Sequence, residues 1–303
     1  MQETFDLAMA WDWEFDAEFA SELDRALRAR GRMFCSITHH NLPEFLERVS
    51  SGGVAIRTFL DRASDTDPRF LPLTQALRFS RARFVNFPEA MRHAADKATM
   101  HLEFLTRGID VPYTIIISPY NERHDVDLSI SDLSKLGRPF IIKPANTTGG
   151  GVGVVLGAET LMDVLESRQH HKGDKYLLQE TILPASPRGR MAWFRVFWTR
   201  GKIHTCWWHP ETHRYELAIE GEVAELVPSG FAEIMERIHS VCELDFFSTE
   251  IAVTGAGRVV VVDYVNETCD MRFQSKHPDG VPDSVVREIC DSLAAPYKSV
   301  EGQ

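Results

Sequence analysis

The sequence predicts a mixed α/β protein of three lobes, spanning residues 1–90, 91–182 and 183–303. Strand-like and helical patterns alternate through the first third of the chain, and two strongly apolar runs near the C-terminus flank a Gly255-Ala256-Gly257 turn. The 303 residues, of which 44% are hydrophobic, are enough to bury a sizeable core in each of several lobes. Together these observations indicate α/β and α+β layers.

The first lobe is expected to contain a parallel sheet covered by helices. Its elements follow the order strand, helix, strand, helix, strand, in the segments FDLAMAW, AEFASELDRALRARG, RMFCSIT, LPEFLERVSSGG and VAIRTFL. Ligand loops of such sheets lie at the carboxyl ends of the strands, which places residues 11–14 at the edge of a cleft. A solvated loop with one packed tryptophan is the alternative interpretation of this segment.

The other two lobes are expected to be α+β units. A long amphipathic helix that Pro88 begins and Gly108 ends leads into the middle lobe, which ends near Ile182. Its later segments are PYTIIIS, LSISDLSKLG, RPFIIKPA, a glycine-rich loop, AETLMDVLESRQHH and KYLLQETI. The last lobe is predicted from the strands MAWFRVFWTR and KIHTCWWH, the helix FAEIMERIHSVCEL, the hairpin FFSTEIAVT and GRVVVVDYV, and the helix VPDSVVREICDSL.

Charge and composition narrow the classes of partner. The chain has 44 acidic and 33 basic residues, so its formal net charge of −11 repels a phosphate backbone and argues against nucleic acid. No apolar stretch approaches the roughly 20 residues that cross a bilayer, so we expect no membrane partner and a cytoplasmic location. The five scattered cysteines are expected to be reduced. The sequence leaves open whether the protein forms a homo-oligomer.

The most informative segment is FIIKPANTTGGGVGV, in which an apolar strand delivers Lys143 to a glycine-rich loop. In that loop, Thr147, Thr148 and the three glycines Gly149, Gly150 and Gly151 can present backbone N–H groups and hydroxyls to phosphate oxygens. The lysine precedes the glycines, so the loop is not a Walker A motif, and it lacks the spacing of a dinucleotide-binding loop. A mobile linker is the alternative for a glycine run taken alone.

From Phe87 to the C-terminus these segments resemble the ATP-grasp superfamily, which includes glutathione synthetase, D-alanine:D-alanine ligase and the carboxylate-amine ligases. The resemblance implies an ATP-grasp fold, with an N-terminal βαβ lobe, a small central α+β lobe and a C-terminal metal-binding lobe. It further implies that the cofactors are ATP and Mg²⁺, with two ions.

The resemblance assigns the nucleotide contacts. Lys97 and Lys143 match the two lysines that contact the phosphates, although Lys97 also suits a surface helix. The segment KYLLQETI looks like the hinge strand that reads adenine, a role that falls on Gln179, Glu180, Thr181 and Ile182. The acid that often follows the hinge and binds the ribose is not evident in LPASPRGR.

A metal site is expected on the C-terminal hairpin. Glu250 and Asp263 lie on its adjoining strands, where carboxylates can converge on Mg²⁺, and Asn266 completes the family's set of two acids and an asparagine. Two residues separate Asp263 from Asn266, so strand alternation places them on opposite faces unless a bulge intervenes. An ion pair within the sheet is the alternative role for the acids.

Two arginines and a loop near the C-terminus are the candidates for contacting the transferred phosphate and the substrate. Arg195 resembles the family's arginine that faces the transferred phosphate, because a planar guanidinium suits an oxyanion. Arg272, Ser275 and Lys276 are expected on a loop next to the metal site, where a substrate anion could sit, and Arg272 is a second catalytic candidate. A solvated basic loop is the alternative.

The reaction that this resemblance implies is ATP-dependent joining of a carboxylate to an amine. A small-molecule or peptide carboxylate would be activated as an acyl phosphate, which an amine then displaces, with ADP and phosphate released. A small-molecule kinase of the same fold is the first alternative. A protein that binds Mg-ATP but has lost its catalysis is the second.

Overall fold

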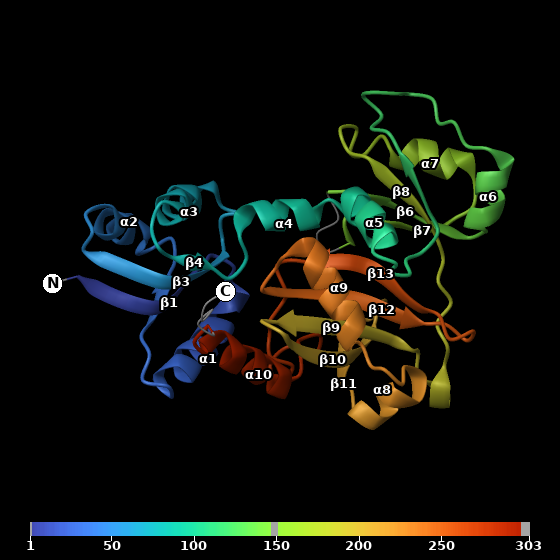
Figure 1. The fold of residues 1–303 in the computed structure, drawn as a ribbon. Coiled ribbons are helices and arrows are strands. Elements are labelled where there is room, and N and C mark those ends of the chain that lie inside the picture. Colours follow the sequence, from blue (N-terminus) through green and yellow to red (C-terminus); the bar gives the residue numbers. More distant parts are fainter. Residues whose placement is uncertain (1, 147–150, 298–303) are drawn as a thin grey trace.

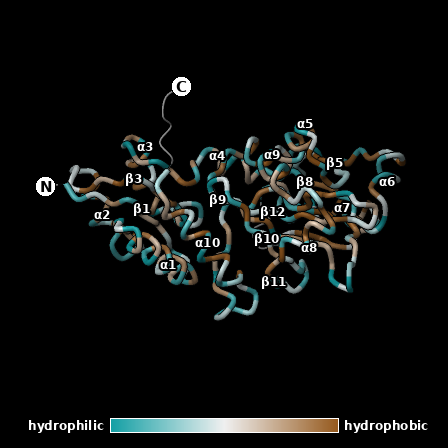
Figure 2. The backbone as a smooth tube through the Cα atoms, turned by 60° about the horizontal axis from the view of Figure 1, so that its bottom comes forward, coloured by the Kyte–Doolittle hydropathy of each residue, from teal (hydrophilic) through white to brown (hydrophobic). Residues whose placement is uncertain are grey.

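The computed structural model describes residues 2–146 and 151–297, which form three β-sheets flanked by helices (Figure 1). The mixed α/β class expected from the sequence is confirmed. Hydrophobic stretches are concentrated in the strands, and hydrophilic stretches in the outer loops (Figure 2). Within the described residues, no helix is long and apolar enough to cross a membrane.

The first sheet is parallel, as expected, with the strand order β2-β1-β3-β4. Its elements are β1 (Glu3–Trp11), η1 (Glu14–Asp16), α1 (Ala17–Arg28), β2 (Phe34–Ile37), α2 (Leu42–Ser50), β3 (Val54–Arg62), η2 (Pro68–Phe70), α3 (Leu71–Arg78) and β4 (Arg83–Phe84). The apolar face of α1 buries Phe19, Leu23 and Leu27 beneath the sheet. Helix α3 and the short β4 were not expected from the sequence.

The central sheet is antiparallel, with the order β5-β8-β6-β7. Its elements are β5 (Thr114–Ile117), α6 (Ile130–Leu136), β6 (Phe140–Pro144), β7 (Val155–Ala158), α7 (Leu161–Ser167) and β8 (Tyr176–Glu180). Both helices begin with a capping box, in which Ser129 and Thr160 exchange hydrogen bonds with the third residue of the helix. Strand β8 is paired on both sides, so its backbone is held rigidly up to Glu180.

The C-terminal sheet has the antiparallel order β11-β10-β9-β12-β13. Its elements are η4 (Pro187–Gly189), β9 (Trp193–Thr199), β10 (Lys202–His209), β11 (Arg214–Leu217), α8 (Glu220–Leu226), α9 (Ala232–Cys242), β12 (Phe246–Val253), β13 (Val259–Asn266) and α10 (Asp283–Ala294). Phe194, Val196 and Trp198 enter the core beneath α9, whereas Phe197 enters the core beneath α10. Arg195 therefore projects to the α10 side of the sheet.

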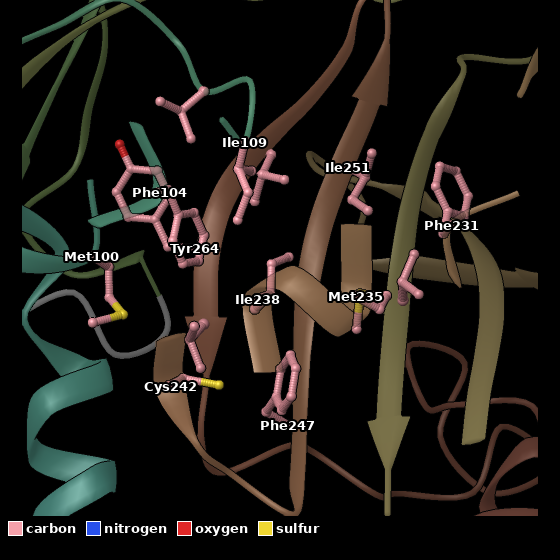
Figure 3. Packing of buried hydrophobic residues seen from close by; sticks show 14 of the residues in the cluster. Met100, Phe104, Ile109, Phe231, Met235, Ile238, Cys242, Phe247, Ile251 and Tyr264 are labelled. Carbon is pink, nitrogen blue, oxygen red and sulfur yellow. The ribbon is translucent and has the colours of Figure 1, made fainter. Parts of the chain in front are cut away.

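The long helix expected after Pro88 is two helices, α4 (Pro88–Ala95) and α5 (Lys97–Thr106), separated at Asp96. The backbone of Asp96 is extended there, and its side chain accepts hydrogen bonds from the N–H groups of Ala98 and Thr99. Both helices pack on α9 and β13, in the core shown in Figure 3. They thus lie on the C-terminal sheet, although the sequence division at residue 91 grouped α5 with the central lobe.

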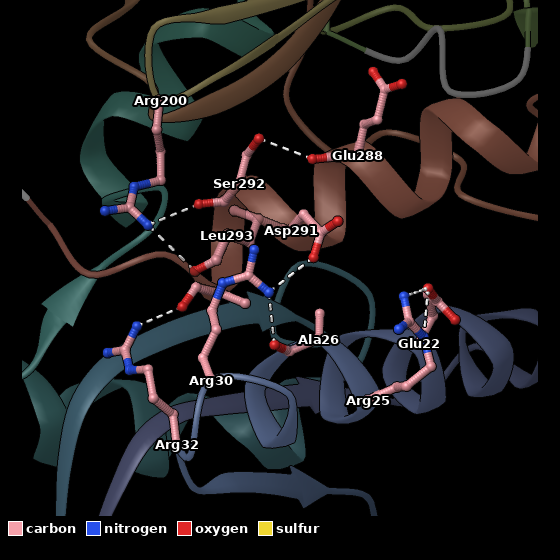
Figure 4. A network of polar contacts seen from close by, with 11 residues as sticks. Glu22, Arg25, Ala26, Arg30, Arg32, Arg200, Glu288, Asp291, Ser292 and Leu293 are labelled. Carbon is pink, nitrogen blue, oxygen red and sulfur yellow. Dashed lines mark hydrogen bonds and ion pairs between the residues drawn. The ribbon is translucent and has the colours of Figure 1, made fainter.

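Helix α10 joins the last lobe to the first. It packs against α1, and its C-terminal carbonyl groups accept hydrogen bonds from Arg32 and Arg200, which come from different lobes (Figure 4). Arg30 adds an ion pair with Asp291. The first and last lobes are therefore held together at this helix.

Candidate active site

The two hairpin acids face each other across neighbouring strands. Glu250 of β12 is in register with Asp263 of β13, while Ser248 is in register with Asn266. Between these pairs, Thr249 of β12 opposes both Tyr264 and Val265 of β13, so an extra residue lies between Asp263 and Asn266. This is the bulge that the spacing of the acid and the asparagine requires.

Glu250 is bound by groups of strand β9. Its two carboxylate oxygens lie 3.0 Å from Nη2 of Arg195 and 3.0 Å from Nε1 of Trp193, which donates a hydrogen bond. Burial raises the pKa of Glu250, and the Arg195 guanidinium opposes that effect. Arg195 is only 8% exposed, and its Nε and Nη1 groups have no hydrogen-bond partner among the described residues. This guanidinium has donors left for an anion.

Asp263 lies in a positive environment. Burial disfavours its charged form, yet Lys97, Lys143 and Arg195 together hold the pKa of the Asp263 carboxyl below its ordinary value. It therefore stays a carboxylate at neutral pH, as a ligand for a hard cation must be. The register of its strand is fixed locally by Thr249, whose hydroxyl donates to the Asp263 carbonyl oxygen at 2.7 Å.

Lys143 reaches from the central sheet to the strand that carries Asp263. It is 7% exposed, its Nζ donates to the carbonyl oxygen of Val262 at 3.3 Å, and the same atom lies 5.0 Å from the ring centre of Tyr264. Burial lowers the pKa of Lys143 to about 8, and Lys97 adds to the lowering. The two sheets therefore meet at a buried lysine beside both hairpin acids.

Lys97 is the first residue of α5, at the break in the expected helix. Its backbone N–H donates to the carbonyl oxygen of Ala145 at 3.1 Å, just beyond the strand that carries Lys143. Because Lys97 contributes to the pKa values of both Lys143 and Asp263, it belongs to the same charge cluster. The break at Asp96 thus places it beside the acids.

The expected hinge residues lie at the end of β8. Gln179 is buried and donates from Nε2 to the hydroxyls of Thr114 and Tyr264, and the Glu180 carboxylate accepts from the backbone N–H of Tyr113. Thr181 is exposed, and its hydroxyl donates to the carbonyl oxygen of Pro139. Ile182 packs with apolar residues of the β12–β13 hairpin. The ladder of β8 ends at Glu180, so the backbone of the last two residues lies beyond the sheet.

The glycine-rich loop is only partly described. Thr147, Thr148, Gly149 and Gly150 lie outside the described residues. Gly151 and Gly153 have φ values of 80° and 75°, which favour glycine. A Cβ on Gly153 would come within 3.2 Å of His171 and Pro144, so the loop returns tightly against the end of β6.

The three residues expected on a substrate loop already have partners. Arg272 pairs with Asp270 and Asp279, and Ser275 hydrogen-bonds Asp283 at the start of α10. Lys276 pairs with Glu18 of the first lobe. The structure brings Lys97, Lys143, Arg195, Glu250 and Asp263 together, whereas these three serve contacts within and between lobes.

Two residues of the cluster were missed from the sequence. Trp193 hydrogen-bonds Glu250, and Tyr264 contacts Lys143 and Gln179. Both are neighbours of predicted site residues, but buried aromatic residues in strands are ordinarily assigned to the core. Only their polar atoms, an indole N–H and a phenol, hint that they need partners in the interior.

The donor set fits Mg²⁺. No group of three or more His, Cys, Asp or Glu side chains close enough to hold a metal occurs in residues 2–146 and 151–297. The facing carboxylates of Glu250 and Asp263 are hard oxygen ligands and leave positions free for phosphate and water, as Mg²⁺ prefers. Zinc or iron, which favour nitrogen and sulfur ligands, are poorly matched to such a set.

Comparison with known proteins adds structural relatives. No family model and no curated protein matches the sequence. A RimK domain ATP-grasp protein of Sphaerobacter thermophilus superposes with a TM-score of 0.63 at 20% identity, covering 95% of this chain and 98% of that one. The ATP-grasp ligase PsnB, complexed with minimal precursor, Mg and ADP, gives 0.62 at 16%, covering 95% and 96%. D-alanine–D-alanine ligase of Bacillus anthracis, complexed with ATP, gives 0.60 at 15%, covering 95% and 97%.

Proposed function

Because the chain has the ATP-grasp fold that these structures share, we propose that it is an ATP- and Mg²⁺-dependent, ADP-forming ligase that joins a carboxylate to an amine. The observation that carries this proposal is the meeting of two lysines, an arginine and two acids at the junction of the central and C-terminal sheets. The PsnB and D-alanine–D-alanine ligase structures, which hold ADP with Mg and ATP respectively, support a nucleotide role for it.

The charges of the cluster suit a triphosphate. Three cations and two carboxylates leave an excess positive charge, buried between two sheets, where electrostatic attraction is stronger than in water. Lys97 and Lys143 would contact the phosphates, and the glycine-rich loop from Thr147 to Gly151 would cover them. The backbone beyond Glu180 would bind the adenine edge, with Ile182 against its face.

The acids would hold the metal. Glu250, Asp263 and Asn266 supply the oxygen donors, and bound Mg²⁺ would neutralise charge that develops on the phosphates. Glu250 would exchange part of its contact with Arg195 for this role, which releases the guanidinium toward the transferred phosphoryl group. The proposed number of bound Mg²⁺ ions is two.

The proposed reaction has two steps, phosphoryl transfer to the substrate carboxylate and attack of the amine on the acyl phosphate. A substrate carboxylate oxygen forms a bond to the γ-phosphorus while the bond to the leaving ADP oxygen breaks, and no protein base is needed because the carboxylate is already a nucleophile. Arg195 stabilises the transferred group as it moves. The amine nitrogen then bonds to the acyl carbon while the bond from that carbon to the phosphate oxygen breaks, and the proton that the nitrogen loses passes to the departing phosphate or to water. Arg272, Ser275 and Lys276 stay candidates for binding the substrate if substrate replaces their present ion pairs and hydrogen bonds.

The test is ADP release across panels of amino acids and short peptides, each offered as carboxylate, as amine, or as both. We expect ADP only when both groups are present, together with a new amide product. Asp263→Asn should abolish release, while Asp110→Asn, which alters a surface acid paired with Arg258, should leave it unchanged. A stable phosphorylated product formed without amine would contradict the ligase proposal and indicate a kinase instead.

A further inference from the structure

Tyr264 is a buried tyrosine at the boundary between the central and C-terminal sheets. Its side chain is fully buried beside Phe104 of α5 (Figure 3). Its hydroxyl nevertheless lies at the centre of a polar network. Gln179 donates to that hydroxyl at 2.6 Å from the central sheet, and Nδ1 of His101 lies 2.9 Å from it on α5. A phenol that only filled the core would not need partners from two lobes.

The donors and acceptors of this network are mutually consistent. Both hydrogens of the Gln179 amide are used, one toward Thr114 at 2.9 Å and one toward Tyr264. The Tyr264 hydroxyl accepts from Gln179 and shares a second hydrogen bond with Nδ1 of His101, whose direction is set by the imidazole tautomer. Burial lowers the pKa of His101 to about 4, so the imidazole that contacts this hydroxyl is neutral at neutral pH. Each side chain of this hydrogen-bonded series, from Thr114 through Gln179 and Tyr264 to His101, is thus held in place by its neighbours.

The ring of the same residue forms part of the surroundings of Lys143. The ammonium lies 5.0 Å from the ring centre and donates to the carbonyl oxygen of Val262, while Asp263 adds an attractive charge. Three successive residues of β13 therefore surround one lysine of β6. Strand β13 thereby fixes the position of the Lys143 ammonium relative to Glu250 and Asp263.

We propose that Tyr264 is a positioning residue, which holds Lys143 with its ring and the hinge residue Gln179 with its hydroxyl, so that both are fixed relative to strand β13, which carries Asp263. This inference rests on the proposed nucleotide role of Lys143 and Gln179. One side chain would then couple the position of the phosphate lysine to that of the adenine-binding strand.

Two substitutions separate the two tasks. Tyr264→Phe keeps the ring beside Lys143 and removes the hydroxyl, so Gln179 loses one acceptor and His101 loses its hydrogen-bond partner. Tyr264→Leu removes the ring as well, so Lys143 loses its cation–π contact. Phe231→Leu serves as the control, because Phe231 is a buried aromatic residue of the same core, packed on Phe194.

The experiment measures binding of a non-hydrolysable ATP analogue with Mg²⁺ by calorimetry, and hydrogen exchange of β6 and β8 without nucleotide. We expect about tenfold weaker binding for Tyr264→Phe, the equivalent of one buried hydrogen bond, and a further loss for Tyr264→Leu. Exchange in β8 should be faster in both variants. Phe231→Leu should lower the melting temperature without changing the affinity or the exchange of β8.

The outcomes separate the two proposals. Wild-type protein that does not bind the analogue would overturn the nucleotide role, and the positioning role with it. Wild-type protein that binds the analogue, with both Tyr264 variants binding equally well and exchanging β8 at the wild-type rate, would overturn the positioning role alone. A loss of affinity in Phe231→Leu as large as in Tyr264→Leu would also overturn it, because general loosening of the core would then explain both.

Discussion

Nucleotide binding should weaken as pH rises through about 8, because Lys143 loses its proton there. Burial and Lys97 lower the pKa of Lys143 to about 8 in the free protein. A bound triphosphate would keep the lysine protonated, so binding takes up a proton at higher pH. Raising the pH from about 7 to about 9.5 reduces the protonated fraction from about nine-tenths to about one-thirtieth, which weakens binding about 30-fold, or about 2 kcal/mol.

The assay is calorimetry of an ATP analogue with Mg²⁺ at several pH values, in buffers of different ionisation enthalpy. Near pH 8.5, about 0.8 of a proton should be taken up for each nucleotide bound. Lys143→Arg is the control, since a guanidinium stays charged over this range and should remove both the proton uptake and most of the pH dependence. Equal wild-type affinity at both ends of the range, without proton uptake, would refute the reasoning.

Three further predictions concern stability. The pKa of His101 is about 4 in the folded protein, so stability should fall by about 3 kcal/mol as pH drops from about 6.5 to about 4, and acid unfolding of His101→Gln should lack that slope. Asn86 makes three hydrogen bonds to the ends of the β12–β13 hairpin, so denaturant unfolding of Asn86→Ala should show a loss of about 2–4 kcal/mol; a loss below about 0.5 would contradict this. A Cβ on Gly280 would lie 2.6 Å from a backbone oxygen, so Gly280→Ala should destabilise by about 1–3 kcal/mol. Gly255→Ala, which meets open space, should be neutral, and equal melting temperatures for the two variants would count against the clash.

The charged residues of the cluster could be recognised in the sequence because two of them lie inside strongly apolar strands. A lysine in FIIKP and an acid in VVVVDYV are charges inside apolar strands, and such charges require partners. The hairpin turn then placed Glu250 against Asp263, and the spacing to Asn266 required an irregularity that the register contains. The alternation in the first lobe was equally clear, since short apolar runs separated by amphipathic helices form parallel sheets.

Other features depend on contacts between distant segments. The break at Asp96 was missed because the amphipathic pattern continues across it, and the capping role of this aspartate is not visible in the pattern. The partners of Arg272 and Lys276 come partly from the first lobe, so a basic loop taken alone suggested free cations. From the sequence, Tyr264 is assigned to the hydrophobic core, because only the structure shows that Gln179 and His101 contact its hydroxyl.

The most direct test of the central claim is a crystal structure with a non-hydrolysable ATP analogue and Mg²⁺. We predict the triphosphate between Lys143 and Lys97 on one side and a metal held by Glu250 and Asp263 on the other, with adenine beside the end of β8. Nucleotide bound elsewhere, or density showing Glu250 and Asp263 away from any metal and phosphate, would contradict the account.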